Sequence, residues 1–259
     1  MGAAAVRALA AKGDRVIMAC RNPRKAETVR ASVIRDIPAA VVDIAELDLS
    51  SFASVRSFAE GLSGVPLDAL FNNAGIINRE YSITPDGLEN TLETNYAGPF
   101  LLTGLLLPQM RDGSVVVNMV SLTCRYGNVD KSLFERGEDR FSQLGTYSDT
   151  KLALLLSSIS LSRRCGRIRV NVADPGIVNS NMISMGRWFD PLADAIFRPL
   201  CKSPGKGVAP ALRALASDSN LHYFVNRSEH PVPERYMSHP FLDWLWDETL
   251  SRVGLFNFR

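Results

Sequence analysis

The sequence is poor in residues that cross-link a chain or bind metal ions. It has four cysteines, well separated and without a CxxC pair: Cys20, Cys124, Cys165 and Cys201. It has three histidines, all toward the C-terminus and without the spacing of metal ligands: His222, His230 and His239. Both observations argue against a disulfide framework and a zinc site, so we expect free thiols in a reducing compartment.

The sequence also lacks long hydrophobic runs and a strong net charge. No apolar stretch approaches ~18 residues, and the first helix carries Arg7 and Lys12, which argues against a membrane span and a signal peptide. The formal net charge is only +2, and the charged residues are scattered along the 259-residue chain. We therefore expect a cytoplasmic protein that binds neither nucleic acid nor membranes.

A third absence concerns the order of elements. The opening MGAAAVRALAAKG is typical of a short helix followed by a turn at Gly13 and Asp14, and an apolar strand comes next at 15–20. A helix that leads into a buried strand is expected to have a strand before it, and none precedes this one.

The rest of the chain alternates regularly between apolar runs and helical segments. Strands are predicted at 15–20, 41–50, 67–75, 114–121, 167–176 and 222–226. Helices are predicted at 22–36, 51–62, about 85–110 and 147–165, with Asn22 as a possible cap and Pro23 at a first helical position. The strands are nearly continuous apolar runs, as in parallel strands covered by helices on both faces. We predict a single α/β domain over residues 1–259, with a doubly wound parallel sheet.

Two long connections follow predicted strands, at the end of the sheet where ligands of such folds bind. Residues 122–145 are polar, whereas 177–207 contain many apolar residues and could be a substrate lid or a helix that packs on the core. The tail, residues 231–259, includes PFLDWLWDETLSRVGL, which is typical of an amphipathic helix used for packing or for contact between subunits. A homo-oligomer therefore stays possible.

The most specific local pattern is YSDTK, in which Tyr147 and Lys151 lie one helical turn apart on the same face. A nearby ammonium favours the phenolate and lowers the pKa of a tyrosine from ~10, so this pair could transfer a proton to or from an oxygen. Taken alone, the pattern favours an exposed helical pair over a catalytic one. Ser121 ends an apolar strand, where its hydroxyl would point into the ligand crevice.

Two further segments could contribute to a site. NNAG, residues 72–75, ends another strand, and Gly75 would allow backbone to approach a ligand closely. Asn95 lies within the predicted long helix, ahead of Pro99, so a functional kink and a solvated helix position are both open readings.

These motifs occur in the order and approximate spacing of the short-chain dehydrogenase/reductases, and the chain resembles that family over essentially its whole length. The shared elements are NNAG, the asparagine of TNYAG, a serine after an apolar strand, YSDTK and DPGIV. The ACRN segment, DLSSFASVRSFAE and the long gap between Ser121 and Tyr147 look most like the retinol dehydrogenase and protochlorophyllide reductase branch. The resemblance implies a Rossmann-like fold and an oxidoreductase that interconverts a carbonyl and an alcohol.

The resemblance also implies a role for each catalytic position. Tyr147 would be the general acid in reduction and the base in oxidation, and Lys151 would lower the pKa of Tyr147 and hydrogen-bond the nicotinamide ribose. Ser121 would hold the substrate oxygen and stabilise its developing charge. Asn95 would help to hold a water in the proton relay. The cofactor supplies the hydride.

The cofactor expected is NADP(H). Arg21 follows the strand at 15–20, where an arginine suits a 2′-phosphate, and Arg24 and Lys25 are close behind; the alternative is a solvated helix start. Asp48, followed by Leu49, matches the position that contacts adenine. By resemblance, Asn72, Ala74 and Gly75 line the adenosine side, and the segment near the nicotinamide amide contributes Pro175, Gly176, Val178 and Ser180.

The largest departure from the family pattern is at the start. Family members begin with a strand and a TGxxxGxG loop, and MG aligns with the last two positions of that loop, so Gly2 corresponds to its third glycine. We expect that the sequence is N-terminally truncated, and that the strands at 15–20 and 67–72 are left with unpaired backbone and exposed apolar side chains. The N–H groups and the dipole at the start of the first helix would still attract the negatively charged pyrophosphate of the cofactor.

Two other functions stay open beside the hydrophobic-substrate oxidoreductase. The missing glycine-rich loop favours a catalytically impaired dinucleotide-binding or interaction module, whereas the intact serine, tyrosine and lysine favour an enzyme. The extended relatives of the family, epimerases and dehydratases, share the Tyr-Lys pair but normally have a larger C-terminal substrate region.

Overall fold

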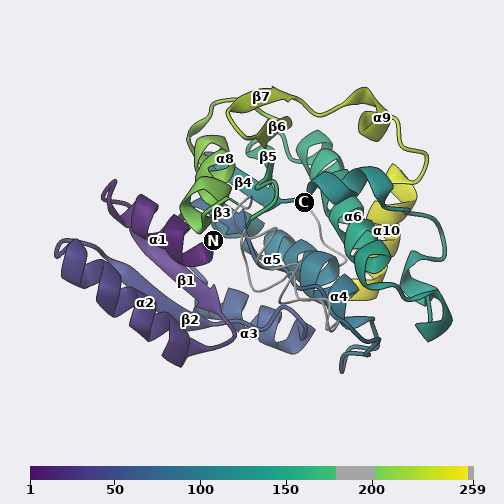
Figure 1. Ribbon diagram of the computed structural model, residues 1–259, viewed down its shortest axis with the longest axis horizontal. Coiled ribbons are helices and arrows are strands. Elements are labelled where there is room, and N and C mark those ends of the chain that lie inside the picture. Colours follow the sequence, from purple (N-terminus) through teal and green to yellow (C-terminus); the bar gives the residue numbers. More distant parts are fainter. Residues whose placement is uncertain (179–201, 256–259) are drawn as a thin grey trace, which may run out of the picture.

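The computed structural model describes residues 1–178 and 202–255, and its strands form two sheets (Figure 1). A parallel pair joins β1 (Val16–Cys20) to β2 (Val42–Glu46), with Val16 opposite Val42. The larger sheet has the order β3-β4-β5-β6-β7. Its strands are β3 (Leu67–Asn72), β4 (Met110–Met119), β5 (Arg169–Asp174), β6 (His222–Val225) and β7 (Ser228–Pro231). All neighbours are parallel except β6 and β7, which are antiparallel.

β1 is an edge strand of the smaller sheet, and β3 is an edge strand of the larger one. Within the described residues, no further strand pairs with the outer side of β1 or of β3. None of the residues of β1 is fully buried, and in β3 only Asn72 is. By contrast, β5 is buried throughout except at Arg169. This confirms the expectation that the strands at 15–20 and 67–72 leave backbone unpaired and apolar side chains partly exposed.

Helix α1 (Gly2–Ala10) connects the two sheets on one face. Val6 and Ala10 pack in a small cluster with Val42, whereas Ala5 packs with Val115 and Val117 of β4. The start of α1 also lies beside α8 (Pro204–Ala216), as Figure 1 shows near the label N. One short helix therefore contributes to the packing of both sheets.

The main core lies between the larger sheet and the helices α5 (Gly98–Leu106) and α6 (Gln143–Arg164). Leu155, Leu156 and Ile159 of α6 have no solvent exposure, because this long helix packs between the sheet and α10 (Leu242–Val253). The other helices are α2 (Pro23–Asp36), α3 (Phe52–Gly61), α4 (Asn90–Leu92) and α9 (Glu234–Met237). None of the helices in the described residues is both long and apolar enough to cross a membrane.

The C-terminal helix α10 shows how the predicted amphipathic tail is used. Its Leu245 is fully buried, and the Trp246 ring lies edge-on to Phe100 at 4.9 Å between centroids. Figure 1 places α10 alongside α6. The packing interpretation of the tail is therefore confirmed for residues 242–253, whereas residues 256–259 lie outside the described part.

The helix expected at about 85–110 is wrong at both ends. Residues 79–89 form a loop closed by a bridge between Ile83 and Glu89, and the helical region begins only at Asn90. Gly87 has φ +83°, which breaks a helix, and the Glu89 side chain accepts hydrogen bonds from Thr91 N and Leu92 N, which starts one. Met110 already belongs to β4.

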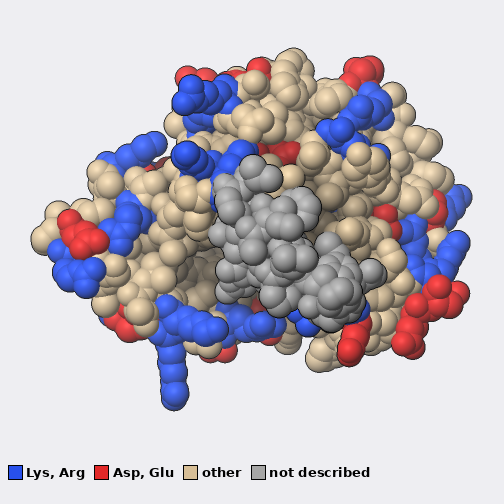
Figure 2. Space-filling model, in the orientation of Figure 1, with Lys and Arg blue, Asp and Glu red and all other residues tan. Residues whose placement is uncertain are grey.

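Charged side chains are spread over the face of the molecule that Figure 2 shows, with Lys and Arg interspersed with Asp and Glu. This mixture of signs agrees with the small net charge of the sequence.

Candidate active site

Four predicted side chains converge at the carboxyl end of β4. Ser121 follows this strand and begins a 3₁₀ turn at Leu122–Tyr126, and its side chain lies near enough to Tyr147 of α6 to lower the pKa of that phenol. Lys151 is one turn further along α6, and Asn95 comes from a π-helical turn at Glu93–Ala97. Ligand sites of such sheets form at the carboxyl ends of the strands, and here Ser121 meets side chains that are 26 or more positions away in the sequence.

The start of α6 is capped in a way that fixes Tyr147. Ser142 Oγ accepts a hydrogen bond from Gly145 N at 3.1 Å, and Thr146 N donates to Ser142 O at 2.7 Å. The helix therefore begins at Gln143, and the prediction that it begins at Tyr147 is wrong. Tyr147 and Lys151 lie on the same face, with Lys151 Nζ 5.7 Å from the centre of the Tyr147 ring.

Lys151 is buried and directed at the backbone. Its Nζ donates a hydrogen bond to Met119 O at 2.9 Å, and burial lowers the pKa of Lys151 to about 8. Burial also raises the pKa of Tyr147 to about 12, against the opposing effect of the Ser121 side chain. The net shift of the Tyr147 pKa is therefore upward, whereas the lowering effect expected of Lys151 stays a prediction.

Asn95 is fully buried, so the solvated reading is wrong and the irregular helix is confirmed. Its Oδ1 accepts from Ile76 N at 2.7 Å, and its Nδ2 donates to Ile76 O at 2.9 Å and to Thr150 Oγ1 at 3.2 Å. A π-helical turn often marks a functional site. Asn95 thus connects the segment after β3 to α6.

Gly75 lies where a larger residue would collide with the site. A Cβ at this position would be 3.2 Å from Lys151 Nζ and 3.4 Å from Asn95 Oδ1. The neighbouring Ala74 is exposed. Gly75 therefore lies close to two of the candidate catalytic side chains. Its predicted close approach to a ligand stays a prediction.

Asn72 is placed differently from the expectation. Its side chain is buried and its Nδ2 donates to Thr103 Oγ1 at 3.0 Å and to Asn118 Oδ1 at 2.8 Å. These bonds tie β3 to α5 and β4. The prediction that Asn72 lines the adenosine side is wrong for its side chain, which points into the core because a buried amide needs polar partners.

The β1–β2 edge carries the predicted cofactor residues. Arg21, Arg24 and Lys25 are exposed at the junction of β1 and α2, and in the described residues no carboxylate is paired with them. Asn22 caps α2 by accepting from Lys25 N at 3.0 Å, as predicted. The carboxylate of Asp48 accepts from Ser50 N at 3.0 Å, and the Leu49 carbonyl lies against Gly98 of α5.

Asn73 is a candidate that the sequence reasoning did not single out. Its Oδ1 is buried without a hydrogen-bond partner in the described part of the chain, and its Nδ2 is 3.3 Å from where a Cβ on Gly2 would lie. Gly2 therefore reaches the same edge as NNAG. The only sequence signal for Asn73 is its place within that motif.

The segment after β5 is held by a lysine that also had no sequence signal. Gly176 has φ +69°, and Lys202 Nζ donates to Pro175 O at 2.9 Å and to Asn226 Oδ1 at 2.5 Å. Val178 and Lys202 form a parallel bridge. Ser180 and most of the predicted lid, residues 179–201, lie outside the described residues.

Comparisons with known proteins agree with this arrangement. The family model described as short chain dehydrogenase matches residues 1–187. The chain is 31% identical to short-chain dehydrogenase TIC 32 A, chloroplastic, from Brassica napus, with 98% of this chain and 85% of the relative covered. It is 30% identical to retinol dehydrogenase 12 from Bos taurus, covering 98% and 83% of the two chains.

A solved structure supports the same conclusion. An uncharacterized protein from Mycobacterium paratuberculosis superposes with a TM-score of 0.76 at 32% identity, with 98% of this chain and 90% of that chain covered. It shares the α/β arrangement of strands and helices described above. The chain is therefore a member of the short-chain dehydrogenase family of oxidoreductases, on the branch that includes the retinol dehydrogenases.

Proposed function

We propose that this protein interconverts a carbonyl and an alcohol on a hydrophobic small molecule, with NADP(H) as cofactor and Tyr147 as the general acid or base. The observation that carries the proposal is the convergence of Ser121, Tyr147, Lys151 and Asn95 at one sheet edge. When bound, the cofactor supplies or accepts the hydride.

The protein's own residues would then hold an oxygen and move a proton. Tyr147 is protonated at neutral pH and can donate that proton to a carbonyl oxygen as negative charge develops there. Ser121, whose side chain acts on the pKa of Tyr147, can bind the same oxygen. Lys151 is the buried cation that favours the phenolate once the proton has left.

The residues present fit a dinucleotide phosphate. Gly75 leaves space beside Lys151, and the Nδ2 of Asn73, a hydrogen-bond donor, lies near the start of α1, where helix N–H groups favour an anion. Arg21, exposed after β1, would contact a 2′-phosphate. Arg21 is the residue on which we base the proposal of NADP(H) rather than NAD(H).

Arg21→Asp is expected to weaken NADPH binding by roughly 10- to 100-fold and to leave NADH binding unchanged or tighter, because the acid repels a 2′-phosphate and accepts from a free 2′-hydroxyl. Fluorescence titration with both nucleotides measures this. Lys12→Asp makes the same charge change at an exposed position before β1. An equal loss in both variants would mean that Arg21 acts only through net charge.

The hydrophobic substrate is supported by apolar side chains around the site. Four large side chains on segments next to the site are between 45% and 74% exposed. They lie after β4, before Tyr147 and after β5: Leu122, Tyr126, Leu144 and Ile177. Exposed apolar side chains on the segments that carry a catalytic site are suited to contact an apolar ligand. The chemistry expected of the ligand is therefore an apolar aldehyde, ketone or alcohol.

Turnover of NADPH with a panel of apolar and polar carbonyl compounds tests the proposal. Preferential oxidation of NADPH with the apolar members is expected. Binding of NADPH with no turnover of any member would instead favour a dinucleotide-binding or interaction module, a function that the open edges of β1 and β3 support. A cytoplasmic location and a homo-oligomer stay part of the proposal, to be tested by fractionation and light scattering.

A further inference from the structure

The polar segment that follows Ser121 is attached along α6 by successive contacts. Gly127 lies so close to α6 that a Cβ there would be 2.5 Å from Ser148 O and 2.9 Å from Leu152 Cβ. The next residue, Asn128, donates its backbone N–H to Asp149 Oδ1 at 2.6 Å. The segment thus runs against the turn of α6 that carries Tyr147.

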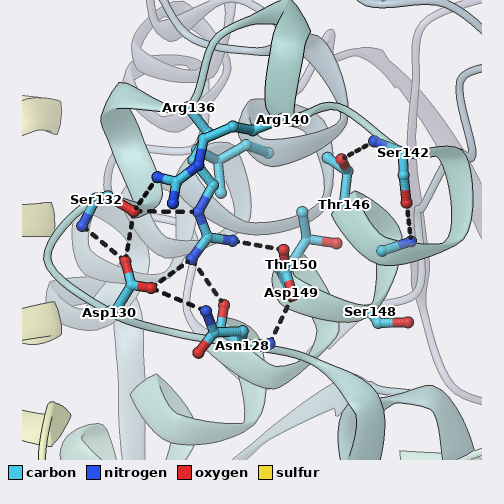
Figure 3. A network of polar contacts seen from close by, with 12 residues as sticks. Asn128, Asp130, Ser132, Arg136, Arg140, Ser142, Thr146, Ser148, Asp149 and Thr150 are labelled. Carbon is cyan, nitrogen blue, oxygen red and sulfur yellow. Dashed lines mark hydrogen bonds and ion pairs between the residues drawn. The ribbon is translucent and has the colours of Figure 1, made fainter.

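A single guanidinium holds this attachment from the other side (Figure 3). Arg136 Nη1 donates to Asp149 Oδ2 at 2.6 Å, and its Nη2 lies 3.2 Å from Asp130 Oδ2. Arg136 also donates to Ser132 Oγ at 3.4 Å and to Asn128 O at 3.3 Å. Every nitrogen of the guanidinium has an acceptor, which a lysine could not reproduce.

The Arg136–Asp149 pair is shielded from water. The side chains of Arg136 and Asp149 are 17% and 15% exposed. By contrast, the Arg111–Asp68 pair, with 2.7 Å between its charged groups at the amino ends of β4 and β3, has side chains that are 58% and 73% exposed. Asp130 is fixed in turn, accepting from Ser132 N at 2.8 Å and from Asn128 Nδ2 at 2.8 Å. Shielded, fully bonded pairs hold their geometry far better than exposed ones.

We propose that Arg136 and Gly127 are positioning residues, which hold residues 121–140 against α6 and thereby align the hydroxyl of Ser121 with the phenol of Tyr147. Neither residue touches the reacting groups. Gly127 sets how closely the segment approaches α6, and Arg136 keeps it there through Asp149. The proposal rests on the proposed function for its kinetic consequences, but its structural consequence can be measured without turnover.

Kinetics test the proposal first. Arg136→Lys and Gly127→Ala are expected to lower kcat on the order of 10- to 100-fold, because a shift of about 1 Å between reacting groups has effects of that size. The KM for NADPH should not change, since the residues expected to bind it lie on other segments. Arg111→Lys is the matched control and should retain full kcat.

A double variant distinguishes alignment from general damage. If Arg136 acts through Ser121, Arg136→Lys combined with Ser121→Ala should lose no more activity than Ser121→Ala alone. Additive losses would overturn the proposal. Loss of thermal stability in Arg136→Lys with unchanged kcat would overturn it as well, because the pair would then be structural only.

A spectroscopic measurement separates this proposal from the proposed function. With ¹³Cζ-labelled tyrosine at pH 8, and Tyr147→Phe to assign the resonance, the Tyr147 signal should shift in Ser121→Ala when the interaction with the Ser121 hydroxyl is lost. Arg136→Lys and Gly127→Ala should move it in the same direction. An unmoved signal in both folded variants refutes the alignment, whether or not the protein turns over any carbonyl compound.

Discussion

Tyr147→Phe is expected to lower kcat by about 10²- to 10⁴-fold, because it removes the only group in our proposal that transfers a proton to the substrate oxygen. Binding of NADPH should be nearly unchanged, since phenylalanine keeps the ring and loses only the hydroxyl. Single-turnover oxidation of NADPH with a reactive apolar aldehyde measures the chemical step directly.

The control for this substitution is Tyr81→Phe. Tyr81 lies in the loop before α4 and its ring packs edge-on to Phe141 at 6.0 Å between centroids, so it makes the same chemical change outside the proposed proton path. Its kcat should stay at the wild-type level. Turnover that survives in Tyr147→Phe would remove Tyr147 from the mechanism and leave the oxidoreductase proposal without its proton donor.

The second large effect concerns stability and depends on Glu93, a buried acid in the π-helical turn. Thr84 Oγ1 donates to Glu93 Oε2, whereas Glu93 Oε1 has no partner in the described residues. Burial raises the pKa of Glu93 from 4.5 to about 8, and nearby Asp86 acts in the same direction. The folded protein therefore holds a proton on Glu93 at neutral pH.

This shift makes the folded state less stable as the pH rises. The stability associated with protonated Glu93 is fully present below pH 4.5 and is lost as the pH rises through about 8, because the unfolded chain releases the proton first. The slope contributed by one such group is at most about 1.4 kcal/mol per pH unit. The irregular turn that positions Asn95 is thus weakened under alkaline conditions.

Glu93→Gln removes the ionisation and is expected to flatten the pH dependence between pH 5 and 8. Urea unfolding across this range measures it, and the variant should exceed the wild type in stability at pH 8 and above. Glu60→Gln, at an exposed position on α3, is the matched control. Parallel curves of stability against pH for Glu93→Gln and the wild type would show that Glu93 does not cause the loss of stability between pH 5 and 8.

Local signals in the sequence were sufficient where an element is defined by its own residues. Helix α2 follows its predicted bounds because Asn22 caps it and Pro23 begins it. Strand β7 was not predicted, because all four of its residues are exposed and show no apolar pattern. Helix α8 was also missed: it contains Gly205, Gly207 and Pro210, which disfavour helices, and tertiary packing of its apolar face stabilises it.

In the site, the sequence identified the residues but not their environment. The spacing of Tyr147 and Lys151 predicted a shared helix face, which the structure confirms. The pKa directions were not predictable, since they depend on how deeply each group is buried in the folded chain. Asn72 shows the same limit, because whether a strand-end amide faces the crevice or the core is decided by its neighbours across the sheet.

The gap between the two sheets has a consequence for the behaviour of the protein in concentrated solution. In the described residues, β1 and β3 each present peptide groups that no further strand pairs, flanked by half-exposed aliphatic side chains, a surface to which an extended polypeptide can attach. Attachment of this kind is driven by backbone bonding and apolar contact, so added salt would not reverse it. We expect association through these two strands to increase with protein concentration.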